Sequence, residues 1–237
     1  MLKVPTTIDD LLKDSIVEIR FNSQVDFALI PGLIYSQLIE KGYTYTGAVS
    51  DPFQQTTSQI IFNFGIAQPT FSNESITCRF NANALIFNCK GKYIGWKKYY
   101  LEILTLLKIV DGINIARSYS RVGLRYINIL KDTNIYEKLV EDLRINLKSH
   151  KNFATNIKTE IIDSKFKINV NLGNDFRIQD SVEKVSVIDI DVFFEGEIKD
   201  LDTLLSILDE IHSKEKEIFF SFLKPEYIET LNPKYER

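Results

Sequence analysis

Residues Tyr119–Leu130 have the sequence YSRVGLRYINIL, and at its centre arginine or glycine alternates with a large apolar or aromatic residue. This period of two predicts a long β-strand. Arg121, Gly123 and Arg125 project from one face of such a strand, and the residues between them project from the other. The two guanidinium groups therefore share a face. The glycine between them either opens a slot over the backbone or marks a bulge.

Two interpretations of these arginines are open. They form salt bridges within the sheet, or they bind an anion, because two guanidinium forks recognise phosphate or carboxylate with fixed geometry. The alternating stretch Val185–Phe194 bears on this choice, since Asp189 and Asp191 share the face opposite its apolar side. We expect Asp189 and Asp191 to neutralise Arg121 and Arg125 on the exposed face of a sheet. If they are not paired with the arginines, the two carboxylates could instead hold a divalent metal. Two Asp residues alone are a weak signal for a metal site.

The periodicity on either side of this strand predicts the remaining helices and strands. Before Ser118 we expect strands at Ile16–Asn22, Gln59–Phe64, Ile76–Phe80 and Ala84–Lys90, with helices at Asp26–Lys41 and Trp96–Val110. After it we expect strands at Tyr119–Leu130, Ala154–Asp163, Lys165–Leu172 and Val185–Phe194, with helices at Asn134–Leu147 and Leu201–Leu223. The order strand, helix, three strands, helix thus occurs twice.

This repeated order predicts an α+β fold made of two β-α-β-β-β-α units, residues 1–117 and 118–237, as pseudo-repeats of one compact domain. Antiparallel strands with one apolar face need helices on that face only. We therefore expect a curved antiparallel sheet with helices packed on one face, saddle-like or helix-grip-like in form. Such an analogy concerns the fold and not the function.

The uncovered sheet face is the predicted binding surface. Its polar residues are Glu18, Arg20, Asn63, Arg79, Asn88, Arg121, Arg125, Asn169, Asn171 and Asp189. The predicted ligand- or partner-binding residues are Arg20, Arg79, Arg121, Arg125, Asp189 and Asp191.

Composition argues against several classes of protein. The net charge of −3 lacks the cationic excess by which proteins grip a nucleic-acid backbone, so duplex nucleic acid is disfavoured as a partner, saddle-type DNA binding included. Residues Met1–Asp10 carry no apolar run, so we expect no secretory signal. No stretch approaches the roughly 20 apolar residues of a bilayer span. We predict a cytoplasmic protein that does not bind a membrane.

Catalytic signatures are missing from the sequence, and no cofactor, metal or catalytic residue is predicted. Cys78 and Cys89 lie in alternating apolar segments and are expected to be buried thiols. His212 falls on the apolar stripe of the last helix and is expected to pack there. Trp96 and the tyrosines after it are expected to wedge a helix against the sheet. Lys214–Glu217 is expected to be solvated helix surface.

Five short motifs occur along the chain: R-V-G-L-R-Y-I-N at 121–128, W-x-x-Y at 96–99, I-D-I-D at 188–191, L-D-E-I-H at 208–212 and F-F-S-F at 219–222. Together they resemble a patchily distributed family of bacterial and archaeal proteins that has no assigned function. The positions that match the family pattern are Trp96, Arg121, Gly123, Arg125, Tyr126, Asn128, Asp191 and His212. The family's distribution implies a role in mobile elements or in defence against phage and plasmids.

Two functions follow as expectations. The first is a non-enzymatic binding or regulatory protein, a sensor or accessory subunit of a defence or toxin-linked system, that holds a protein partner or a small anionic ligand on the polar sheet face. The alternative is a metal-dependent phosphoesterase or nuclease-like enzyme, in which Arg121 and Arg125 hold phosphate and Asp189 and Asp191 hold metal. The sequence does not predict an oligomeric state.

Overall fold

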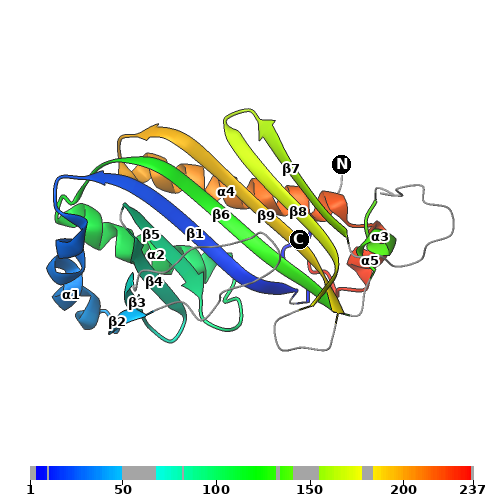
Figure 1. Cartoon of the computed structure of the whole chain (residues 1–237), viewed down its shortest axis with the longest axis horizontal. Helices are drawn as coiled ribbons and strands as arrows, with labels where there is room; N and C mark the ends of the chain where they lie inside the picture. Colours follow the sequence, from blue (N-terminus) through cyan, green and yellow to red (C-terminus); the bar gives the residue numbers. More distant parts are fainter. Residues whose placement is uncertain are drawn as a thin grey trace. The chain divides into compact units, whose positions relative to one another are not determined.

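The computed structural model describes residues 4–9, 11–49, 68–81, 83–131, 134–140, 155–177 and 184–235 (Figure 1). The first elements are β1 (Leu12–Ser23), the 3-10 turn η1 (Phe27–Leu29), α1 (Ile30–Glu40), β2 (Thr44–Val49), β3 (Gln68–Ser72), β4 (Ile76–Asn81), β5 (Ala84–Cys89) and α2 (Trp96–Gly112). They are followed by β6 (Ala116–Lys131), α3 (Ile135–Lys138), β7 (Thr155–Asp163), β8 (Phe166–Arg177), β9 (Lys184–Ile198), α4 (Leu201–Phe222) and α5 (Pro225–Glu229).

The strands form one nine-stranded sheet in the order β2-β3-β4-β5-β1-β6-β9-β8-β7. The pairs β1–β5, β2–β3, β3–β4, β4–β5 and β7–β8 are antiparallel. The predicted α+β class with an antiparallel sheet is therefore confirmed. From the neighbours β1 and β6 outward, the strands on each side follow in descending chain order. The duplication into 1–117 and 118–237, and the saddle-like or helix-grip-like form, stay predictions.

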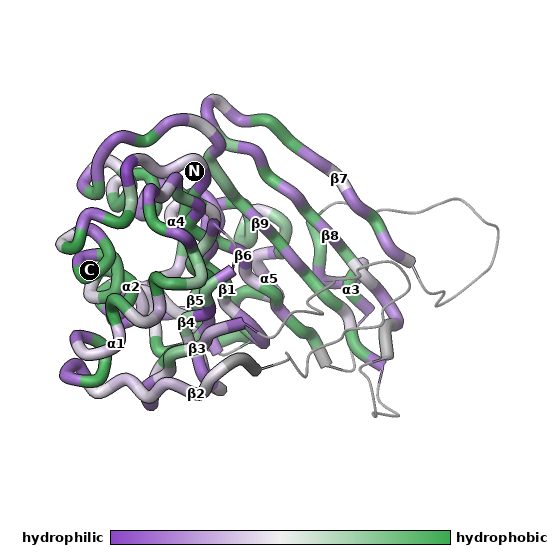
Figure 2. Tube along the Cα trace, turned by 60° about the vertical axis from the view of Figure 1, so that its left-hand side comes forward, coloured by the Kyte–Doolittle hydropathy of each residue, from purple (hydrophilic) through white to green (hydrophobic). Residues whose placement is uncertain are grey.

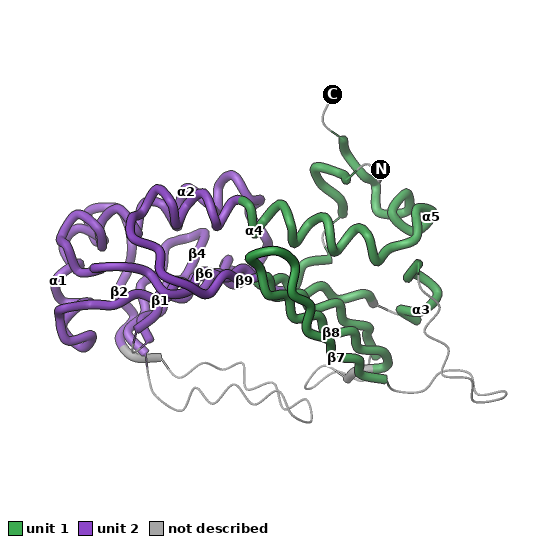
Figure 3. The backbone as a smooth tube through the Cα atoms, turned by 90° about the horizontal axis from the view of Figure 1, so that it is seen from above, with its two compact units in different colours: residues 1–13, 125–192, 210–237 green, residues 14–124, 193–209 purple. Residues whose placement is uncertain are grey.

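Contacts divide the chain into two compact units, coloured separately in Figure 3. Unit 1 contains residues 1–13, 125–192 and 210–237, and unit 2 contains residues 14–124 and 193–209. Because β6, β9 and α4 each have residues in both units, neither unit is one continuous half of the chain.

In unit 2, the described helix α2 packs on the apolar side of the strands, as the alternation predicts. Val17, Ile19 and Phe21 of β1 are buried, as their alternation predicts, and α2 lies along one face of the strands (Figure 3). The hydroxyl of the buried Tyr99 on α2 donates to the carbonyl oxygens of Ser15, at 3.1 Å, and Phe87, at 2.8 Å. The helix is thereby fastened to β1 and β5, and its buried phenol is satisfied.

In unit 1, the last part of α4 lies along one face of the strands (Figure 3). Ile188, Ile190 and Val192 of β9 are fully buried, and their neighbours along the strand include Asp189 and Asp191. The hydropathy of β8 and β9 alternates in the same way (Figure 2). The period-2 pattern thus assigns the two faces of these strands correctly.

The start and end of α1 lie close to the predicted bounds, Asp26–Lys41. The carboxylate of Asp26 accepts a hydrogen bond from the Ala28 N–H at 2.9 Å and caps the 3-10 turn that leads into the helix. Pro31 stands in the first turn, where its missing N–H costs no hydrogen bond. Gly42, with φ of +83°, ends the segment in a left-handed conformation that glycine favours.

The predicted helix Asn134–Leu147 is wrong as described. Asn134 does cap a helix, but α3 ends at Lys138, and Leu139 has an extended backbone that bridges Leu223. Tertiary pairing with the end of α4 therefore overrides the helical pattern at that point. Residues 141–147 lie outside the described part of the chain.

Three short elements escaped the sequence analysis. β3 contains Pro69, and β2 contains Gly47 at φ of +73°, so both give weak strand signals. α5 is a five-residue helix that begins at a proline. The predicted strand Gln59–Phe64 lies outside the described residues. None of the helices in the described ranges is long and apolar enough to cross a membrane.

Candidate binding surface of the sheet

Arg125 and Asp189 form the predicted ion pair inside unit 1. The Nε and Nη2 atoms of Arg125 donate to the two carboxylate oxygens of Asp189, both at 2.7 Å. This fork-to-fork arrangement uses both carboxylate oxygens and fixes the plane of the guanidinium group. The side chains are 17% and 8% exposed, so the pair is largely removed from water. For Arg125, the salt-bridge interpretation is the one that the geometry supports.

Arg121 has carboxylate partners in unit 2. Its Nη1 atom lies 3.0 Å from Oε1 of Glu18, and its Nε atom lies 3.9 Å from Glu195. The same Glu18 oxygen also accepts from Nε of Arg20 at 2.5 Å. The Cζ atom of Arg121 lies 4.4 Å from the ring centroid of Phe193, within cation–π distance. We call these five residues the Arg121 cluster.

Gly123 is needed because of this arrangement. A Cβ atom at position 123 would lie 3.0 Å from Cβ of Phe193 and 3.1 Å from Nη1 of Arg121. The glycine therefore makes room for the guanidinium group and for the close approach of β9. The predicted slot over the backbone at Gly123 therefore exists, but the side chains of Arg121 and Phe193 occupy it.

A second polar network in unit 2 contains Arg79. Its Nη2 atom donates to Oδ1 of Asn88 at 2.8 Å, and the Asn88 amide donates to Asp14 at 3.0 Å. Glu18, Ile86 and Arg79 are directly opposite one another on β1, β5 and β4, so they share a face. Two strand spacings separate Glu18 from Arg79, which is about 10 Å.

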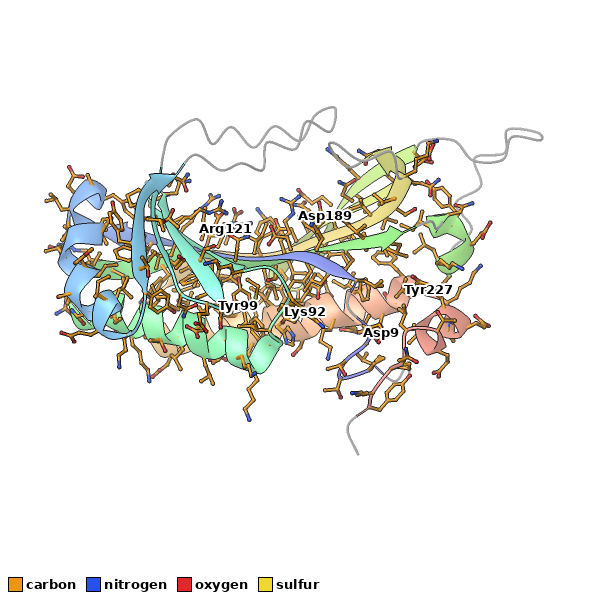
Figure 4. The ribbon with its side chains drawn as sticks, turned by 90° about the horizontal axis from the view of Figure 1, so that it is seen from below. Asp9, Lys92, Tyr99, Arg121, Asp189 and Tyr227 are labelled. Atoms are coloured by element: carbon orange, nitrogen blue, oxygen red, sulfur yellow. The ribbon has the colours of Figure 1, made fainter. Side chains whose placement is uncertain are left out.

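The polar face of unit 2 is defined by Asp14, Glu18, Arg20, Arg79, Asn88 and Arg121. Figure 4 places Arg121 on the side of the strands away from Tyr99 and α2. The same view places Asp189 on the side of its strands away from α4. Both residues therefore project from the faces that no described helix covers, as predicted (Figure 4).

The expectation of an open, wet face needs correction. The side chain of Arg121 is only 11% exposed, and Asp189, Phe193 and Ile86 are buried. Arg20, with a side chain 44% exposed, is accessible. Arg79 and Asp191 are half-buried, Asn169 is exposed, and Asn63 lies outside the described residues. Ion pairing and packing have removed much of this face from water, because adjacent side chains two residues apart cover one another.

Sequence reasoning missed Glu215 altogether. It was expected to be solvated, but it is 1% exposed, and its Oε1 atom has no hydrogen-bond partner within the described part of the chain. Burial raises the pKa of its carboxyl well above the ordinary value, and the smaller effect of Lys216 opposes this. The signal was present, since Glu215 follows Leu208 by seven residues and Ile211 by four on the buried side of α4.

Other single residues behave partly as expected. His212 packs edge-on against Tyr126, with ring centroids 6.4 Å apart, as its apolar stripe predicts. Trp96 is half-buried, and its Nε1 atom donates to Asp209 at 2.9 Å, so Tyr99 and not Trp96 is the ring that fastens α2 to the sheet. Burial raises the pKa of the Cys78 thiol, whereas Cys89 is only half-buried.

Within the described residues, no group of three or more His, Cys, Asp or Glu side chains is arranged to hold a metal ion. Both oxygens of Asp189 accept hydrogen bonds from Arg125, so a metal at Asp189 would have to displace that guanidinium group.

A scan against protein-family models gave no match, and a search of the curated proteins gave none either. The resemblance carried by Arg121–Asn128 therefore stays a prediction. Within that stretch, Arg121, Gly123 and Arg125 all have the structural roles described above.

Proposed function

We propose that the chain is a non-enzymatic binding protein that holds a protein partner on the polar face of unit 2. The observation that carries the proposal is the Arg121 cluster, in which Glu18 shares one oxygen between Arg121 and the exposed Arg20. Arg20 can leave Glu18 at small cost, because an exposed ion pair contributes little to stability. Arg121 then keeps Glu18 oriented.

The balance of charge favours a protein over a small anion. On the polar face and in the Arg121 cluster, Arg20, Arg79 and Arg121 are set against Asp14, Glu18 and Glu195, so the carboxylates already neutralise the guanidinium groups. A lone phosphate would have to displace a carboxylate to bind. A protein surface supplies both donors and acceptors and can satisfy both signs of charge together.

The strand at Arg121–Asn128 resembles the patchily distributed family described above, and this resemblance supports a proposal for the cellular role. Because that family is patchily distributed, we propose a sensor or accessory subunit of a mobile-element, anti-phage or toxin-linked system. The enzymatic alternative has less support, because it requires Asp189 to exchange a two-point contact with Arg125 for a metal.

The test is to purify the tagged chain from its own cells and to rebuild the complex with any protein that accompanies it. Arg20→Glu reverses an exposed charge on the polar face, and Lys97→Glu makes the same reversal at an exposed position of α2. We expect Arg20→Glu to weaken the rebuilt complex about tenfold or more and Lys97→Glu to leave it unchanged. Equal binding by wild type and Arg20→Glu would rule out this surface.

Small anions provide the second arm of the test. We expect inorganic phosphate and a panel of nucleotides to leave the melting temperature of the protein unchanged. If one of them raises the melting temperature of the wild type, and Arg121→Ala abolishes the rise, the ligand is an anion and the choice of a protein partner is wrong.

A further inference from the structure

One edge of the sheet is open in the part of the chain that the structure describes. β7 is an end strand and lies wholly in unit 1, where β8 is its strand partner (Figures 1 and 2). The two strands pair continuously over nine residues, from Thr155 opposite Asn174 to Asp163 opposite Phe166. The outer edge of β7 therefore offers backbone N–H and C=O groups to another strand.

The side chains of β7 are also accessible. Residues 158–162 are all exposed, and Ile162, at 71%, is the most exposed large apolar side chain among the described residues. Proteins commonly protect an end strand with a bulge or by shortening it. β2, the other end strand, has such an irregularity between Tyr45 and Ala48, whereas the register of β7 with β8 is uninterrupted.

Two ion pairs hold the β7–β8 hairpin against α4. Lys214 lies 2.6 Å from the carboxylate of Asp163, and Lys165 lies 2.7 Å from Glu210. The edge is therefore attached to a long helix at its turn. Such an edge loses less conformational entropy when another strand pairs with it.

We propose that β7 pairs in antiparallel fashion with β7 of a second copy of this chain, around a twofold axis at Thr159. For the two faces of the sheet to continue across the interface, odd-numbered residues must lie opposite odd-numbered ones and even-numbered residues opposite even-numbered ones. Thr159 is the midpoint of Thr155–Asp163, so this register is the one that overlaps all nine residues. The two sheets then join into one.

Charge selects the same register. With Thr159 at the axis, Lys158 of each copy lies opposite Glu160 of the other, which gives two cross-strand pairs of opposite charge. Lys158 and Glu160 are both exposed, and neither forms an ion pair within the described ranges of the chain. Sliding to the next register in either direction sets Lys158 against Lys158 or Glu160 against Glu160. Both shifts are unfavourable.

The apolar side chains agree with this register. Ile157 and Ile161 lie opposite Leu172 and Ile168 of β8, both of which are buried. In the proposed dimer, Ile157 of one copy lies opposite Ile161 of the other, twice. The second copy thus extends the apolar layer of the sheet by one strand and covers Ile161, which is 40% exposed in the single chain.

The test measures the mass of the full chain by sedimentation and by light scattering over a range of concentrations. We expect a dimer. Lys158→Glu alone, or Glu160→Lys alone, sets like charges against each other twice and should raise the dimer dissociation constant about tenfold. The double variant Lys158→Glu/Glu160→Lys exchanges the two charges and should restore the wild-type constant.

Mixing makes the test specific for the register. Lys158→Glu and Glu160→Lys, each weak alone, should form a heterodimer when mixed in equal amounts, because every cross-strand pair is then opposite in charge. A monomeric wild type at the highest soluble concentration would refute the proposal. So would a dimer that both single reversals leave unchanged, or one that the double variant fails to restore. Circular dichroism confirms that each variant is folded.

Discussion

Two buried carboxyl groups of unit 1 show opposite ways of removing a carboxyl from water. Asp189 on β9 is 6% exposed, and both of its oxygens accept hydrogen bonds from Arg125. Glu215 on α4 is 1% exposed, and burial raises the pKa of its carboxyl. The first carboxyl has a partner of opposite charge. The second is expected to keep its proton to a higher pH than an ordinary glutamic acid does.

The difference lies in what each side chain faces, not in its own chemistry. Asp189 stands between apolar residues on a strand and is nonetheless placed against a guanidinium group from β6. Glu215 stands between Lys214 and Lys216, yet Lys214 turns away from it to Asp163, at 2.6 Å. Lys214 thus does not neutralise Glu215, and the effect of Lys216 on the pKa of Glu215 is smaller than that of burial.

The largest effect is expected from breaking the Asp189 pair. Arg125→Met keeps the apolar stem but leaves a buried carboxylate without its cation, so we expect a loss of about 3–5 kcal/mol in the free energy of unfolding at neutral pH. Urea denaturation measures it. Adding Asp189→Asn in the same chain should recover part of the loss. A single variant as stable as the wild type would show that the pair is not needed.

Glu215 should give a smaller effect that depends on pH. Below about pH 4, the ordinary pKa range for Glu, the Glu215 carboxyl is protonated in both the folded and the unfolded state. In that range Glu215 does not make the stability depend on pH. As pH rises, only the unfolded carboxyl loses its proton, and the unfolded state gains up to about 1.4 kcal/mol per pH unit until the raised pKa of the folded carboxyl is reached.

Glu215→Gln should remove this slope, because glutamine does not titrate. We expect the variant to gain stability over the wild type as pH increases from 4 to 7, measured by denaturation at each pH. Glu217→Gln, at an exposed position of the same helix, is the control and should follow the wild type. Parallel curves for wild type and Glu215→Gln would mean that Glu215 ionises normally in the folded protein.

The smallest effect is expected at Glu18 of unit 2, a half-exposed carboxylate with two cations. Arg20→Ala removes one of them, and Arg121 remains 3.0 Å away. We expect a loss of no more than about 1 kcal/mol, which high salt should reduce further. Thermal melting at low and high ionic strength measures it. A loss as large as that of Arg125→Met would mean that the exposure of a carboxylate does not determine how much its ion pair contributes to stability.

Part of the site could be predicted from the sequence because it depends on local geometry. Alternation along β6 and β9 sets Arg125 and Asp189 on the face opposite the buried apolar side chains of each strand, and opposite charge then makes pairing favourable. The partners of Arg121 were not predictable in this way. Glu18 is 103 positions earlier in the chain, and strand order determines that it lies beside β6.

The sequence alone determined the class of fold, the alternating faces of the long strands and the ends of α1, because periods of 2 and 3.6 residues and capping residues act over a few neighbours. The tertiary structure decided the end of α3 at Lys138, the burial of Glu215 and the carboxylate partner of each arginine. These depend on which distant segments meet, and a local hydropathy pattern does not specify the order of the strands in a sheet.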